Sequence, residues 1–334
     1  MRNKFLLTTV LFLAFLTIFP AGAQIDLGTG TENFFIELIP TDAPGPNQNI
    51  IARVSAFSFE LNSSQITWIH NGAVALRGTG LKEYGFTTGD VGKSEILTVV
   101  AIDVNGIRHE TEFSLVIADV DILWRAATSI PFWYKGKALA SPKSAITASA
   151  FPNLVSGGRK IPASGLIYRW TLDNDFKQAQ SGAGRNTFTF GAGFSSDLTH
   201  IVNLEVSNLD GNITAKKSID IGVLNPSILV YENDALSGPK NDFAFQDRRN
   251  DVIFAGEKKS FIAHPFFFSL DRGRENLEYV WSVDGRRAGQ EAPQNILNLG
   301  AAADAGGSSV VEILIKNTSN ILQEARQTFT INVL

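Results

Sequence analysis

Apolar residues alternate with other residues in three pairs of segments along this chain. The first segment of each pair has three apolar positions: Leu97, Val99 and Ala101, then Val202, Leu204 and Val206, then Val311, Ile313 and Ile315. The second segment repeats the pattern: Phe113, Leu115 and Ile117, then Ile219, Ile221 and Val223, then Phe329, Ile331 and Val333. A period of two is typical of a strand with one face in a core. Since a short turn separates the two segments, each pair predicts a β-hairpin.

A tryptophan precedes each predicted hairpin at a nearly constant distance. Trp68, Trp170 and Trp281 lie in "ITWIHNG", "YRWTLDN" and "YVWSVDG", and the hairpin turns "VNG", "LDG" and "TSN" end 38, 41 and 39 residues later. The tryptophans are 102 and 111 residues apart. Repeats of this length, with many short strands and no amphipathic helix, predict an all-β chain of three tandem immunoglobulin-like β-sandwiches. We expect each tryptophan to fill its core, burying about 200 Å²; stacking on a ligand is the alternative.

The repeated motif resembles that of a known class of domains. An apolar or aromatic residue, x-Trp-x-apolar, an Asp, Asn or His and then Gly or Asn precede the hairpin, and this order is similar to immunoglobulin-like domains of the PKD kind. "WIHNG", "WTLDN" and "WSVDG" replace the usual Trp-x-Phe-Gly-Asp-Gly of that family. The resemblance covers three copies and implies tandem β-sandwich domains like those of bacterial cell-surface proteins.

The N-terminus predicts export. Arg2 and Lys4 precede an uncharged run of 15 residues, and Ala21-Gly22-Ala23 is a typical cleavage site. The run is shorter than the roughly 20 residues that a membrane-spanning helix needs, so we expect residues 1–23 to be a cleaved signal peptide, with a retained anchor as the alternative. The predicted domains are then residues 24–118, 119–224 and 225–334. Because no Ser-, Gly- or Pro-rich spacer separates them, we expect a stiff rod.

Composition and motifs narrow the function. The chain has no cysteine, which excludes a lipid-attachment cysteine and any disulfide. Loss of Arg2 and Lys4 leaves 27 basic against 33 acidic residues, a net charge of −6 that disfavours nucleic acids and anionic membranes as partners. The four histidines occupy unrelated positions, and neither a His-Glu-x-x-His nor a Gly-x-Ser-x-Gly motif occurs. We therefore expect no enzymatic activity and no cofactor apart from the calcium considered below.

Two aromatic triplets are the candidate interaction residues. Phe132-Trp133-Tyr134 and Phe266-Phe267-Phe268 lie in or just after long segments near the start of the second and third copies. One strand cannot bury three adjacent aromatic residues, because neighbours point to opposite faces. The triplets therefore cover a domain junction, bind a partner protein, or, for Trp133 and Tyr134, stack on a glycan.

Four aspartates are candidate calcium ligands. Asp119 and Asp121 lie at the predicted boundary between the first two domains, while Asp173 and Asp175 follow the second core tryptophan. Clustered carboxylates suit a hard cation, and such an ion would stiffen a domain junction. The alternative is that these residues are solvated turn formers.

These observations predict an exported structural or interaction protein without catalytic activity. We expect it in the periplasm, on the cell surface or outside the cell, as a component of a pilus, surface layer or secretion apparatus. Its partners would be other envelope or appendage proteins, or further copies of itself. The alternative is an adhesin or carbohydrate-binding module. The final strand "TFTINVL" carries no sorting signal, which disfavours covalent attachment to a cell wall.

Overall fold

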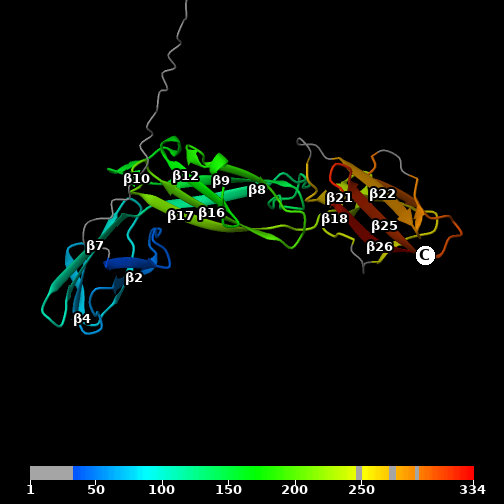
Figure 1. The fold of residues 1–334 in the computed structure, drawn as a ribbon. Helices are drawn as coiled ribbons and strands as arrows, with labels where there is room; N and C mark the ends of the chain where they lie inside the picture. Colours follow the sequence, from blue (N-terminus) through cyan, green and yellow to red (C-terminus); the bar gives the residue numbers. More distant parts are fainter. Residues whose placement is uncertain (1–32, 246–249, 271–275, 290–292) are drawn as a thin grey trace, which may run out of the picture.

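The protein folds into three successive all-β sandwiches (Figure 1). The structure, a computed structural model, describes residues 33–245, 250–270, 276–289 and 293–334, so the predicted signal peptide lies outside the described residues. Helical structure in this part of the chain is limited to two 3-10 turns, η1 (Ala163–Gly165) and η2 (Gln178–Gln180). The predicted fold class, three tandem immunoglobulin-like sandwiches, is confirmed.

The first sandwich contains seven strands in two antiparallel sheets. One sheet has the order β1-β2-β5 and the other the order β4-β3-β6-β7, so the chain crosses between the sheets as in a Greek key. The strands are β1 (Phe34–Ile39), β2 (Asn49–Ala56), β3 (Gln65–His70), β4 (Ala73–Thr79), β5 (Glu83–Thr87), β6 (Ser94–Ile102) and β7 (Arg108–Val116).

The second sandwich repeats this plan with additional short strands. Its sheets have the orders β15-β9-β8 and β13-β12-β16-β17, with β14 also pairing β12 and a separate hairpin of β10 and β11. The long strands are β8 (Asp119–Ala126), β9 (Ala145–Asn153), β12 (Ile167–Leu172), β15 (Thr187–Gly191), β16 (Thr199–Ser207) and β17 (Thr214–Gly222). The short ones are β10 (Val155–Ser156), β11 (Arg159–Lys160), β13 (Asp175–Phe176) and β14 (Gly182–Ala183).

The third sandwich again pairs its first two long strands in one sheet and its last two in the other. The sheet orders are β19-β18-β21-β24 and β20-β26-β25-β22-β23, and β20 runs parallel to β26. The strands are β18 (Ser227–Asp234), β19 (Gly238–Pro239), β20 (Asn250–Ile253), β21 (Lys258–Phe266), β22 (Leu277–Val283), β23 (Arg286–Arg287), β24 (Ile296–Gly300), β25 (Gly307–Asn317) and β26 (Glu324–Val333).

Each sandwich has its own hydrophobic core around one tryptophan. Trp68, Trp170 and Trp281 are 0% exposed and belong to three separate clusters. Each indole N–H donates to a backbone carbonyl in the loop that follows, those of Leu81, Arg185 and Gln294, at 2.8, 2.9 and 3.2 Å. A buried indole needs such an acceptor, so each tryptophan also fixes the path of one loop.

The polar residue three positions after each tryptophan closes a turn. Asn71, Asp173 and Asp284 all have left-handed backbone angles, with φ of 49°, 51° and 48°. The side-chain oxygens of these residues accept the backbone N–H groups of Ile96, Ile201 and Val310 at 2.9, 2.8 and 2.8 Å. Asn and Asp tolerate this conformation and bond locally, which explains why the motif repeats.

The sandwiches join through the same two ends each time. We call the chain between the first two long strands the first connection: residues 40–48, 127–144 and, of the described residues, 235–245 and 250–257 in the three sandwiches. The end of each sandwich at which the first long strand enters this connection is its connection end. The opposite hairpin end carries the turn between the last two long strands, at residues 103–107, 208–213 and 318–323. In Figure 1 the second and third sandwiches follow one line, whereas the first is angled away from that line.

One edge strand of the second sandwich is covered by a side chain. The Gln180 amide donates from Nε2 to the carbonyl of Thr189 on β15 and accepts the Thr189 N–H at Oε1, both at 2.8 Å. This side chain therefore occupies the main-chain groups that a neighbouring strand would use.

Candidate functional site

The first connection of the second sandwich pairs with the third sandwich through an isolated antiparallel β-bridge between Thr128 and Ser269. Ser129 accepts the N–H of Phe267 and donates its own N–H to the carbonyl of Phe268, each at 2.7 Å. The Leu270 N–H donates to the carbonyl of Ala127 at 2.9 Å. Three main-chain hydrogen bonds thus join the sandwiches directly, as in strand addition to a sheet.

The two aromatic triplets meet at this junction. The ring centroid of Trp133 lies 6.1 Å from that of Phe266, and Tyr134 lies 5.3 Å from Phe266 and 6.3 Å from Phe267. All three contacts are edge-to-face, the arrangement that aromatic quadrupoles favour. Phe132, by contrast, is 97% exposed. Trp133 and Tyr134 are partly buried, with their rings against the third sandwich.

Phe268 corrects the expectation for the second triplet. It is 0% exposed in the core around Trp281 and therefore offers no surface to a partner. Phe267 has a φ of 64°, a left-handed conformation that is strained for a bulky residue and costs on the order of 1–3 kcal/mol. Its neighbours are fixed on both sides, by the core at Phe268 and by the second sandwich at Ser129, and these contacts offset the strain.

Three buried polar atoms at the junction lack hydrogen-bond partners among the described residues. They are Ser129 Oγ, Trp133 Nε1 and His264 Nε2. The rings of Trp133 and Tyr231 surround His264, with centroids 5.6 and 5.8 Å away. Burial lowers the pKa of His264, because an apolar environment disfavours the imidazolium. The junction therefore favours neutral His264.

A buried side-chain amide also connects the two sandwiches at this junction. Gln323, 1% exposed, donates from Nε2 to Ser141 Oγ at 2.7 Å and to the carbonyl of Pro142 at 2.8 Å, both in the second sandwich. Its Oε1 accepts the Ser269 N–H at 2.7 Å and Asn317 Nδ2 at 2.9 Å. Buried polar groups satisfied in this way fix one geometry, because any displacement leaves them unpaired.

The four calcium candidates do not converge. Asp119 and Asp121 lie on β8, whereas Asp173 and Asp175 belong to the opposite sheet. Asp121 lies 3.7 Å from Lys217, and Asp175 lies 2.5 Å from Lys177. Asp173 accepts the N–H of Ile201 and lies 2.7 Å from His200. Within the described ranges no group of three or more His, Asp or Glu side chains could hold a metal.

The junction between the first and second sandwiches is polar. Asp42 in the first connection accepts two 2.8 Å hydrogen bonds from Lys216, which also lies 3.6 Å from Glu205. The hydrogen bond from Lys216 holds the pKa of Asp42 below its ordinary value. Burial alone would lower the pKa of Lys216, but the hydrogen bond and charge of Asp42 raise it overall. Two open hollows, of about 810 and 680 Å³, are both lined in part by Lys216.

One buried acid in the first sandwich had no signal in the sequence. Glu95, 4% exposed, lies 2.7 Å from His70 Nε2 and accepts hydrogen bonds from Asn71 Nδ2 and the Gly89 N–H. Burial by itself would raise the pKa of Glu95, but these three partners hold it below the ordinary value. These contacts join three turns of the first sandwich. Both carboxylate oxygens of Glu95 are engaged in them.

Comparisons with known proteins give structural neighbours only. No protein-family model and no curated protein matches the chain. The central fibronectin-III array of RIM-binding protein aligns over 92% of this chain and 99% of its own, at 11% identity and a TM-score of 0.30. The three N-terminal domains of the bacteriophage RB49 highly immunogenic outer capsid protein align over 90% and 97%, at 11% identity and a TM-score of 0.25. Fibronectin(III)-like modules of Clostridium thermocellum CbhA align over 57% and 94%, at 14% identity and a TM-score of 0.26. At such scores we transfer no function.

In the part of the chain that the structure describes, no helix has the length and apolar character that crossing a bilayer requires.

Proposed function

We propose that the protein is an exported, non-catalytic scaffold of the bacterial envelope or of a surface appendage. The observation that carries the proposal is the second junction, where main-chain pairing, an aromatic cluster and the buried Gln323 amide join two sandwiches. Tandem sandwiches joined by a loose linker need none of these contacts. Residues committed to a fixed inter-sandwich geometry suit a protein that holds other components at a set distance.

The assignment is tested in the producing organism by cell-surface crosslinking, affinity recovery of the protein and mass spectrometry of what is attached. A scaffold is expected to recover envelope or appendage subunits, or itself, in reproducible ratios. Recovery of the monomer alone, together with binding of soluble glycans that a Phe132→Ala variant loses, would instead indicate a carbohydrate-binding module and contradict the proposal.

Rigidity is tested separately on the purified chain. Spin labels on exposed strands of the second and third sandwiches are expected to give one narrow distance distribution by double electron–electron resonance. A Trp133→Ala variant should broaden it, while Trp124→Ala, in the same sandwich, serves as the matched control. A broad distribution in the unmodified chain would remove the structural basis of the proposed function.

A further inference from the structure

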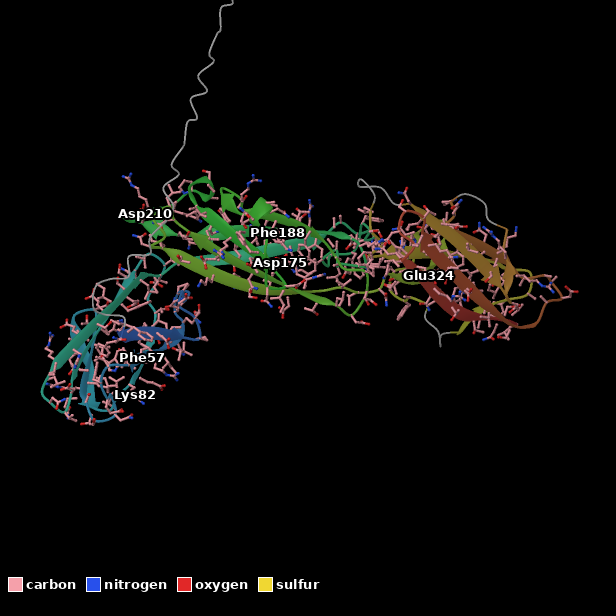
Figure 2. All side chains as sticks on the ribbon, viewed as in Figure 1. Phe57, Lys82, Asp175, Phe188, Asp210 and Glu324 are labelled. Carbon is pink, nitrogen blue, oxygen red and sulfur yellow. The ribbon has the colours of Figure 1, made fainter. Side chains whose placement is uncertain are left out.

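His264 lies where the second sandwich packs on the third. It belongs to β21, and its ring centroid is 5.6 Å from that of Trp133, of the second sandwich, and 5.8 Å from that of Tyr231 on β18. Phe266, two positions along the same strand, also contacts the Trp133 ring. Figure 2 shows side chains of both sandwiches filling the space between them. Separation of the two sandwiches therefore removes Trp133 from His264 and opens the imidazole to water.

The Nε2 atom of His264 is buried and has no hydrogen-bond partner among the described residues. A neutral imidazole tolerates this position, because its one proton can reside on Nδ1. An imidazolium carries a second N–H, which would point here without an acceptor, and it also places a charge in apolar surroundings. Burial accordingly lowers the pKa of His264. Uptake of a proton by His264 therefore opposes the closed junction.

The other three histidines each lie beside a carboxylate. His70, His109 and His200 are 2.7, 3.4 and 2.7 Å from Glu95, Asp103 and Asp173. A carboxylate oxygen can accept the additional N–H of an imidazolium. Within the described ranges no carboxylate lies at ion-pair distance from His264, so its protonation leaves a charge without a partner.

The charged groups on the elements around His264 are engaged elsewhere or exposed. These elements are β18, β21 and the first connection of the second sandwich. Glu232 pairs with Lys240 and Lys259, Lys259 also pairs with Asp251, Asp234 accepts N–H groups of its own turn, Lys137 and Lys143 lie over Trp124 and Phe194, and Lys135 and Lys258 are exposed. Burial raises the pKa of Tyr231, which stays neutral at and below neutral pH. On these elements, His264 is thus the group that changes charge between pH 7.5 and 5.5.

We propose that the junction between the second and third sandwiches is an acid-sensitive hinge, closed while His264 is neutral and opened when His264 takes up a proton. Each sandwich has its own core, so both stay folded when the hinge opens. Opening breaks the main-chain hydrogen bonds that Ser129 and Ala127 make with residues 267–270. The inference goes beyond the proposed function, because it adds a regulation to the junction on which that proposal depends.

Amide hydrogen exchange tests the hinge on the full chain. The Phe267 and Leu270 amides donate across the junction, so their protection factors report its opening. Uptake of one proton by a group with an ordinary pKa of about 6.5 in the open state increases the opening equilibrium by up to about 10-fold between pH 7.5 and 5.5. The protection factors of both amides should fall by the same ratio, which is already corrected for the pH dependence of exchange in an unfolded chain.

Two substitutions and one matched control make this result specific. His264→Gln and His264→Phe should each give equal protection at the two pH values, even where the substitution weakens the junction, because neither side chain titrates. His200→Gln, in the second sandwich, should keep the change of the unmodified chain. Protection that does not depend on pH in the unmodified chain, or the same pH dependence in both His264 variants, would overturn the proposal.

Two further results would also contradict the hinge. Amides of β25 around the buried Ile313 should remain better protected at pH 5.5 than those of Phe267 and Leu270; equal protection would mean that the junction opens only when the third sandwich unfolds. A rise in protection at pH 5.5 would mean that the Trp133 and Tyr231 rings hold the imidazolium as a cation–π pair, so that acid closes the junction. A narrow distance distribution at pH 7.5 would leave the scaffold function intact in each of these cases.

Discussion

Replacement of Gln323 by leucine should open the junction between the second and third sandwiches. The variant loses two hydrogen bonds to Ser141 and Pro142, each contributing about 1 kcal/mol. It also leaves the Ser269 N–H without the acceptor it has at 2.7 Å, which costs about 1–3 kcal/mol for a buried donor. Since leucine adds some apolar contact, we expect a net loss of about 3 kcal/mol, or about 100-fold in the opening equilibrium.

Amide hydrogen exchange measures this opening locally. Exchange of the Phe267 and Leu270 amides, which donate to carbonyls of the second sandwich, should accelerate about 100-fold in Gln323→Leu, whereas amides near Trp68 in the first sandwich should be unaffected. Gln65→Leu is the control, because Gln65 is exposed and bonds only to the neighbouring Thr79, so it should change stability by less than about 0.5 kcal/mol. Unchanged exchange at Phe267 and Leu270 in Gln323→Leu would refute the reasoning, since the Gln323 side chain would then not be what closes the junction.

Three further predictions concern pH, charge and core packing. Because burial lowers the pKa of His264, protons bind this side chain more readily in the unfolded state, so the free energy of unfolding is greatest above about pH 6.5 and declines as the pH falls below that value. The melting temperature should therefore be lower at pH 5.5 than at pH 7.5, and His264→Gln should lack this decrease. Lys216→Met should broaden the distance distribution between the first two sandwiches yet change unfolding free energy by less than about 1 kcal/mol, and an unbroadened distribution would contradict the role of its pair with Asp42. Trp281→Ala should cost about 3–5 kcal/mol in urea unfolding, and more than Trp124→Ala, which removes a partly buried ring; equal losses would argue against a core role.

The strand pattern could be predicted from the sequence because burial imposes it directly. The nine alternating positions before the three hairpin turns, among them Leu97, Val202 and Ile313, are at most 2% exposed. The alternating pattern is strict because a shift of one residue in strand register would turn the buried face of the strand to solvent. The tryptophan motif was informative for the same reason, since its Asn or Asp closes a turn with a bond inside the same sandwich.

The junction could not be predicted, because its contacts join residues that share no local pattern. Gln323 follows a turn and looks like a solvent-exposed residue, yet its partner Ser141 lies 182 positions earlier. The two aromatic triplets indicated a contact, but not which residues of one triplet would meet which residues of the other. The sequence also does not show the left-handed backbone of Phe267, with a φ of 64°, next to the buried Phe268. Which faces meet depends on how consecutive sandwiches stack, and that information is spread over the whole chain.

The Gln180 side chain on β15 has a consequence for crowding. An exposed strand edge recruits any other such edge regardless of sequence, and the risk grows where many copies are displayed together. By holding both main-chain groups of Thr189, one amide blocks lateral sheet growth at that edge. Crowding of many copies is therefore better tolerated at this position of β15 than at an edge strand whose main-chain groups face solvent.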